Sequence, residues 1–214
     1  MTHDVAIPLA TGQDQIAATL ATPGEPRGLV VFAHGSGSSR RSPRNLQVAD
    51  VLHRRGHATL LLDLLTEEEE IEDAPTGKWR FDIPLLADRL HSACLWARTH
   101  EDLGVLPLGL FGASTGAAAA LIAATEPGAD VRAIVSRGGR PDLAGQLLPL
   151  VSAPTLLIVG EADPTVVELN QEAATRMPRA TLEVIAGATH LFEEPGALRQ
   201  VAELAADWFD RFLV

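Results

Sequence analysis

Short apolar runs alternate with segments of helical periodicity along most of the chain. Each run has the length and composition of a strand that is buried on both faces of a sheet. The runs cover residues 27–33, 58–64, 106–111, 131–135, 154–160 and 181–185. We predict a strand at each of them.

Helices are predicted between these strands and after the last one. Ser42 and Pro43 supply a helix cap and a first-turn proline. The last helix has an apolar stripe formed by Leu198, Val201, Ala205, Trp208, Phe209 and Phe212. The predicted helices cover residues 43–55, 81–100, the small-residue run 117–124, 141–148, 164–177 and 195–213. Such alternation predicts a mostly parallel sheet with helices on both faces.

The amino-terminal segment follows a different pattern. Residues 5–9 and 15–21 are strand-like and are separated by the turn-rich stretch 10–14, which predicts an antiparallel hairpin at one edge of the sheet. The expected fold class is therefore α/β, with about eight strands in a single domain over residues 1–214. The connection from residue 135 to residue 154 has fewer than about 20 residues, too few for a separate cap domain, so we expect an open, shallow pocket.

The acidic stretch 66–80 does not fit the alternation. Thr66 and Glu69 are spaced for a capping box, but no apolar stripe follows before Pro75. We therefore predict an acidic surface loop with one helical turn. A solvated connection is the simpler interpretation, and a mobile flap beside a ligand site is the alternative, because the stretch follows the carboxyl end of a parallel strand.

Composition excludes several classes of partner. The chain has 214 residues, 46% of them hydrophobic, and a formal net charge of -11, which disfavours nucleic acid and anionic membranes. Neither a leader nor a long apolar segment is present, so we expect a cytoplasmic protein. The single cysteine, Cys94, is expected to be buried and inert. No metal site is expected, because one cysteine and scattered histidines do not make a zinc cluster.

The sequence Gly112-Ala-Ser-Thr-Gly116 lies between a predicted strand and a run of small residues. A serine in this strand-turn-helix context is presented as a nucleophile, and small neighbours are required because the turn is sharp. We therefore predict that Ser114 is the nucleophile of an enzyme.

Serine needs a base and an acid that orients the base. Asp163 follows the strand at 154–160, and His190 follows the strand at 181–185, so both would reach the same sheet edge as Ser114. Glu161 competes with Asp163 for the acid role, and Asp163 before Pro164 would also cap a helix. His190 is the one histidine after the last predicted strand.

An oxyanion needs two backbone N–H donors. We expect one from Thr115 and a second from the loop 34–39, with Ser36 as first choice and Gly37 as second. Arg137 and Arg140 follow another predicted strand, where they would bind a substrate carboxylate or form ordinary salt bridges.

These motifs together resemble the α/β-hydrolase superfamily, and within it the dienelactone-hydrolase-like group. The resemblance covers essentially the whole chain and depends on four segments: 34–37, 112–116, 160–163 and 187–190. It implies hydrolysis of small carboxylic esters or lactones through a covalent intermediate, without a cofactor or metal. Some members of that group use cysteine as the nucleophile, whereas this chain has Ser114, which favours general ester hydrolysis over the dienelactone substrate.

Two alternatives remain open at this point. The chain could be a non-catalytic or regulatory binding module that keeps the fold, or an acyltransferase or thioesterase with the same three residues. Spacing specifies neither the substrate nor the oligomeric state.

Overall fold

The fold is known from a computed structural model that describes residues 1–9, 12 and 14–213. Eight strands form one sheet in the order β1-β2-β4-β3-β5-β6-β7-β8. The first two pairings, β1 with β2 and β2 with β4, are antiparallel, and the others are parallel. The strands are β1 (Thr2–Pro8), β2 (Gln15–Ala21), β3 (Gly28–Ala33), β4 (His57–Leu62), β5 (Leu108–Ala113), β6 (Val131–Arg137), β7 (Thr155–Gly160) and β8 (Ala180–Ile185).

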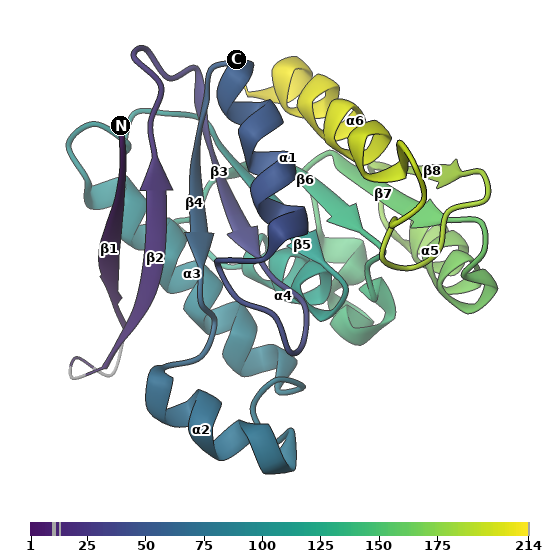
Figure 1. The fold of residues 1–214 in the computed structure, drawn as a ribbon, viewed down its shortest axis with the longest axis horizontal. Coiled ribbons are helices and arrows are strands. Elements are labelled where there is room, and N and C mark those ends of the chain that lie inside the picture. Colours follow the sequence, from purple (N-terminus) through teal and green to yellow (C-terminus); the bar gives the residue numbers. More distant parts are fainter. Residues whose placement is uncertain (10–11, 13, 214) are drawn as a thin grey trace.

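This topology confirms the predicted fold class, including the antiparallel hairpin at the amino-terminal edge (Figure 1). Residues 10, 11 and 13 of the predicted turn lie outside the described residues. The central strands β3, β4, β5 and β7 are buried at every position, as their uninterrupted apolar runs require.

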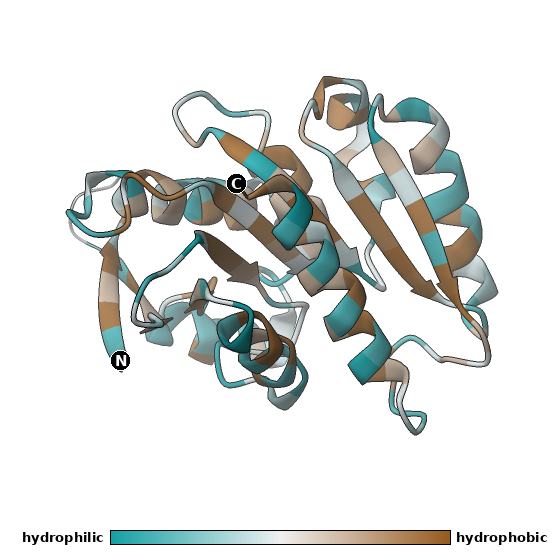
Figure 2. Ribbon diagram, turned by 90° about the horizontal axis from the view of Figure 1, so that it is seen from above, coloured by the Kyte–Doolittle hydropathy of each residue, from teal (hydrophilic) through white to brown (hydrophobic). Residues whose placement is uncertain are grey.

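Helices cover both faces of the sheet (Figures 1 and 2), and the sheet separates the core into two apolar layers. One layer lies under α1 and α6, and the other lies under α3, α4, α5 and a 3-10 segment, η1, that is broken at Gly145 (φ 55°). The elements are α1 (Pro43–Arg54), α2 (Glu67–Thr76), α3 (Ile83–Thr99), α4 (Thr115–Ala123), η1 (Pro141–Leu150), α5 (Pro164–Arg176) and α6 (Ala197–Phe212).

The predicted acidic loop is wrong in one respect, because most of it is a helix. Helix α2 spans ten residues, begins at a complete capping box between Thr66 and Glu69, and includes Pro75 near its end. Glutamates fill its first turn, where their negative charges interact favourably with the positive end of the helix dipole. The pattern failed because α2 is anchored by polar side chains rather than by an apolar stripe.

The crossover pattern fixes where a site can form. The chain runs from β3 to its neighbour β4 and then returns to the other side of β3 to make β5. The loops that leave β3 and β5 therefore diverge at the carboxyl end of the sheet, the position at which open α/β sheets bind ligands. Helix α2 protrudes beyond this end of the sheet in Figure 1.

Candidate active site

Ser114 lies at the bend between β5 and α4, in a backbone conformation that is rare for a residue with a side chain. Its φ is 50° and its ψ is -119°. Its N–H donates to the carbonyl of Arg137 over 3.1 Å, and its own carbonyl accepts from the N–H of Arg140 over 3.1 Å. Strained conformations of this kind cost about 1–3 kcal/mol and cluster at active sites. Ser114 is partly exposed.

Asp163 and His190 lie on the loops that follow β7 and β8. Their side chains are joined by a 2.8 Å hydrogen bond in which His190 Nδ1 donates to Asp163 Oδ2. This bond fixes the tautomer, so Nε2 is the nitrogen that remains free to accept a proton. The other carboxylate oxygen of Asp163 accepts from Val166 N over 3.5 Å. Asp163 thus caps α5 and orients the imidazole at once.

Glu161, the competing acid, has a different partner. Its carboxylate accepts a 2.8 Å hydrogen bond from the N–H of Gly187, which ties the loop after β7 to the loop after β8. The structure therefore brings Asp163, and not Glu161, to His190.

The end of β6 lies between Ser114 and His190. Arg137 O is bonded to Ser114 N, and a Cβ built on the next residue, Gly138, would lie 3.5 Å from both Nδ1 and Cε1 of His190. The two candidate residues thus flank the same strand end. Among the hydrogen bonds of the described residues, none joins the hydroxyl of Ser114 to the imidazole. Such contacts are often long in the absence of substrate.

The expected oxyanion donors have an unexpected arrangement. Thr115 is the first residue of α4, where its N–H has no acceptor within the helix. The N–H of Ser36 donates to the hydroxyl of Thr115 over 3.0 Å. Sequence reasoning assigned Ser36 as a direct donor and missed this side-chain contact. Gly37 has a φ of 69° and lines the neighbouring hollow.

His34 holds the loop after β3 in place. Its Nε2 accepts from the N–H of Leu64 over 3.1 Å, so its Nδ1 carries the proton and donates to Gly35 O over 2.8 Å. Burial lowers the pKa of His34, although the Gly35 carbonyl and the Asp63 carboxylate oppose this effect. A neutral His34 thus joins the end of β3 to the end of β4.

Arg137, the last residue of β6, and Arg140, which follows the strand, have different surroundings. Arg140 forms a bidentate salt bridge with Asp142 at 2.7 and 2.8 Å, which matches the salt-bridge alternative. Arg137 is only 8% exposed, and its Nη1 has no hydrogen-bond partner in the part of the chain that the structure describes. Burial lowers its pKa to about 10, and the nearby Arg44 contributes to this shift.

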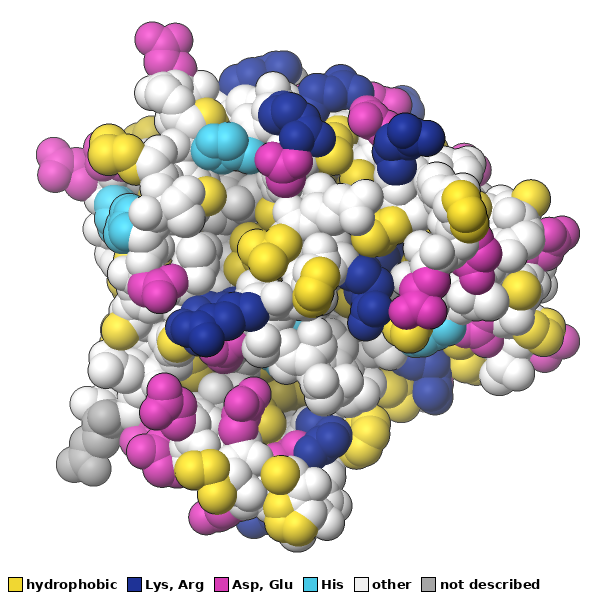
Figure 3. All heavy atoms as spheres, viewed as in Figure 1, with side chains coloured by type: hydrophobic (Ala, Val, Ile, Leu, Met, Phe, Trp, Pro, Cys, Tyr) yellow, Lys and Arg dark blue, Asp and Glu magenta, His cyan; other side chains and the backbone are white. Residues whose placement is uncertain are grey.

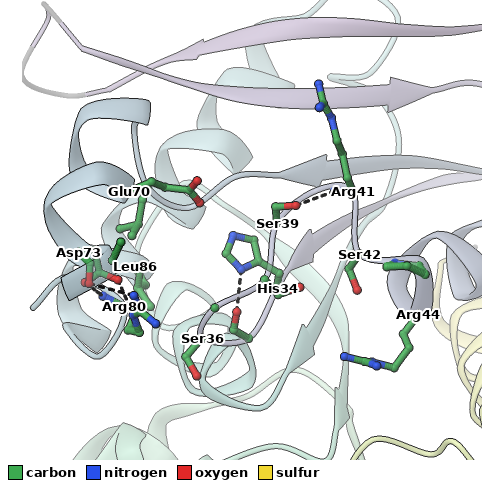
Figure 4. Close-up of a pocket in the computed structure, with 16 residues that line it drawn as sticks. His34, Ser36, Ser39, Arg41, Ser42, Arg44, Glu70, Asp73, Arg80 and Leu86 are labelled. Carbon is green, nitrogen blue, oxygen red and sulfur yellow. Dashed lines mark hydrogen bonds and ion pairs between the residues drawn. The ribbon is translucent and has the colours of Figure 1, made fainter. Parts of the chain in front are cut away.

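A hollow of about 740 Å³ borders the loop after β3 (Figure 4). Arg44 lines it on one side, and on the other side Arg80 is bonded to Asp73 of α2. Ser36 is among its lining residues, whereas Ser114 is not. Acidic side chains gather around α2 in Figure 3.

Other features bear on cofactors and membranes. Within the described residues, no group of three potential ligands is placed to hold a metal ion. No helix in the described part of the chain has both the length and the apolar character needed to cross a bilayer. Cys94 is fully buried in the core, and burial raises the pKa of its thiol to about 12.

Comparison with known proteins identifies the family to which this chain is similar. The model of the dienelactone hydrolase family matches residues 16–213. A dienelactone hydrolase structure from Anabaena variabilis is 51% identical, with a TM-score of 0.97, and the alignment covers 100% of this chain and 99% of that one. The esterase Est1E from Butyrivibrio proteoclasticus has a TM-score of 0.80 at 15% identity over 97% of this chain and 98% of its own, which shows a shared fold alone.

Curated relatives are longer than this chain. Two Mycobacterium tuberculosis proteins, from strains H37Rv and CDC 1551, are 58% identical over 208 residues, and both carry the provisional name phosphoribosyl transferase. The match covers 97% of this chain and 46% of each relative. The chain therefore spans about half the length of these relatives.

Proposed function

The chain belongs to the dienelactone hydrolase family, and from this premise we propose that it is a serine hydrolase that cleaves small carboxylic esters or lactones. The observation that carries the proposal is the 2.8 Å bond between His190 Nδ1 and Asp163 Oδ2, at a sheet edge where Ser114 occupies a strained bend. An oriented imidazole and a serine at such a bend are the parts that acyl transfer needs.

In the proposed reaction, Ser114 Oγ attacks the acyl carbon while His190 Nε2 removes the hydroxyl proton. Asp163 stabilises the imidazolium through Nδ1, and the negative oxygen of the tetrahedral intermediate accepts a hydrogen bond from Thr115 N–H. Collapse breaks the carbon–oxygen bond, and the imidazolium donates its proton to the leaving alcohol. Water, deprotonated by His190, then attacks the acyl-enzyme and releases the acid and free Ser114.

A first experiment compares native protein with Ser114→Ala on p-nitrophenyl esters of graded chain length and on a set of lactones. We expect native turnover on short esters and a loss of about 10⁴-fold or more in the variant. Ser152→Ala, at an exposed serine before β7, is the matched control and keeps native rates. A fluorophosphonate that labels native protein and Ser152→Ala, but spares Ser114→Ala, identifies the nucleophile.

The same experiment separates the alternatives. Absence of both turnover and labelling would contradict the proposal and favour a binding module. Labelling with turnover only on thioesters, or only when an acceptor alcohol is added, would redirect it to a thioesterase or an acyltransferase. Phosphoribosyl transfer is not proposed, because that name describes relatives of which this chain covers 46%, whereas the hydrolase family covers residues 16–213.

A further inference from the structure

The residue after the proposed nucleophile has a hydroxyl in an unusual position, and the following inference rests on the proposed function. Thr115 is 5% exposed, and its Oγ1 accepts a 3.0 Å hydrogen bond from the N–H of Ser36, a residue 79 positions earlier in the chain. The two segments are pressed together, since a Cβ on Gly35 would lie 3.0 Å from the Cβ of Ser114.

This bond changes which groups can stabilise an oxyanion. An amide has a single proton, and that of Ser36 is already donated to Thr115 Oγ1. A hydroxyl can accept one hydrogen bond and still donate its own proton. No hydrogen bond of the described residues uses the Thr115 hydroxyl as a donor, so its proton has no acceptor among them.

We propose that the hydroxyl of Thr115 donates a hydrogen bond to the oxyanion and is a catalytic residue. The chain of bonds runs from Ser36 N–H to Thr115 Oγ1 and from the Thr115 hydroxyl proton to the substrate oxygen. Ser36 is then a positioning residue, because its amide orients and polarises the hydroxyl without touching the substrate. Thr115 supplies two donors, its N–H and its hydroxyl, at a buried point where each is worth more than in water.

The test compares Thr115→Val with Thr115→Ser on p-nitrophenyl acetate and butyrate. Valine keeps the branched shape and the backbone N–H but has no hydroxyl. We expect kcat of Thr115→Val to fall by about 10²–10³-fold, with KM within a few-fold of native. Thr115→Ser keeps the hydroxyl and is expected to lose less than about tenfold. Thr125→Val, which removes a hydroxyl bonded to Ile122 O beyond the other end of α4, is the matched control and keeps the native kcat.

A second readout uses an alkyl boronic acid, which forms a tetrahedral anion on the serine. Its affinity for Thr115→Val should fall by the same factor as kcat/KM, because it carries the charge that the hydroxyl would stabilise. A role confined to holding the loop would instead raise KM or lower the melting temperature, with kcat and boronate affinity unchanged. Thr115→Ala, which also lacks the hydroxyl, gives the same comparison if the valine variant does not fold.

Failure of this inference differs from failure of the proposed function. If native protein hydrolyses the esters and is labelled at Ser114, but Thr115→Val is within about threefold of native kcat, the amide of Ser36, released from Thr115, is the direct donor and the inference is wrong. If native protein neither hydrolyses the esters nor is labelled, the proposed function itself is wrong.

Discussion

The residues beside Ser114 pack closely around its strained bend. A Cβ on Gly116 would lie 2.4 Å from the carbonyl oxygens of Ala33 and His34, and one on Gly112 would lie 2.4 Å from the Cα of Ala117. Gly116 therefore allows the bend to pack directly against the end of β3, and Gly112 allows β5 to pack directly against the first turn of α4. Close backbone approach, rather than freedom at φ, is the reason for glycine at these two positions.

The first prediction concerns Gly116→Ala. The added methyl group meets two backbone oxygens that cannot rotate away, so we expect the free energy of unfolding to fall by about 3 kcal/mol. Urea denaturation followed by tryptophan fluorescence measures this loss. Gly24→Ala is the control, because a Cβ built on Gly24 would have no neighbour within 4 Å, and it should change stability by less than about 0.5 kcal/mol. Equal stabilities for the two variants would show that the bend relaxes without cost.

Position in the fold indicated from the sequence which two side chains would meet. Asp163 and His190 were selected because they follow parallel strands, and the structure joins them by a hydrogen bond. The contact between Ser36 and Thr115 depends on the distance between two loops 79 residues apart, and no local pattern encodes it. The burial of Arg137 was missed for the same reason, because strand position alone does not say what packs over a side chain.

Helix α2 shows how a helix can form without an apolar face. Its single buried residue is Asp73, which accepts hydrogen bonds from the N–H groups of Trp79 (2.6 Å) and Arg80 (3.0 Å). Glu69 is bonded to both terminal nitrogens of Arg89, an arginine of α3 that is only 6% exposed. Hydrophobic periodicity could not predict α2, because the anchoring side chains of Glu69 and Asp73 are charged and their partners lie outside the helix.

The second prediction tests this anchoring with Glu69→Gln. Glutamine can still close the capping box, so the change removes mainly the charge that faces Arg89. A buried guanidinium without a carboxylate is costly, and we expect a loss of about 3 kcal/mol in the free energy of unfolding. Faster hydrogen exchange in residues 67–76 should accompany it. The exposed Glu68→Gln on the same helix is the control, and identical behaviour of the two variants would mean that the ion pair does not hold α2.

The main helices and strands were predictable because their apolar patterns coincide with packing. Ser42 caps α1 by accepting from Asn45 N over 3.4 Å, as its place before Pro43 indicated. The stripe on α6 packs as predicted, with Val201, Ala205 and Phe209 completely buried. The observed boundaries of these elements differ from the predicted ones by a few residues, since the ends are set by contacts between loops rather than by periodicity.

Two buried histidines form hydrogen bonds between different elements at opposite ends of the central strands. His34 links β3 to β4 at the carboxyl end through Leu64 N. His57 is fully buried at the start of β4, and its Nε2 lies 2.9 Å from Asp210 Oδ1 of α6. Burial lowers the pKa of both rings. For His57 the Asp210 carboxylate opposes this effect, and the charges of Arg27 and Arg55 add to it.

The last prediction follows from the sign of these two shifts. A histidine with a lowered pKa binds its proton more weakly in the folded protein than in the unfolded chain, whose histidine pKa is about 6.5. As the pH falls through this value, the unfolded state therefore takes up more protons than the folded state does, and the folded state becomes less stable. Each ring contributes at most about 1.4 kcal/mol per pH unit until its own folded pKa is reached.

Carboxylates add to acid sensitivity mainly below about pH 5, so the interval from about pH 7 to pH 5 isolates the histidines. Urea denaturation across this interval should show the free energy of unfolding decreasing as the pH falls, and His57→Gln should reduce the slope. A flat profile, or greater stability at the lower pH, would mean that neither ring is held neutral by burial.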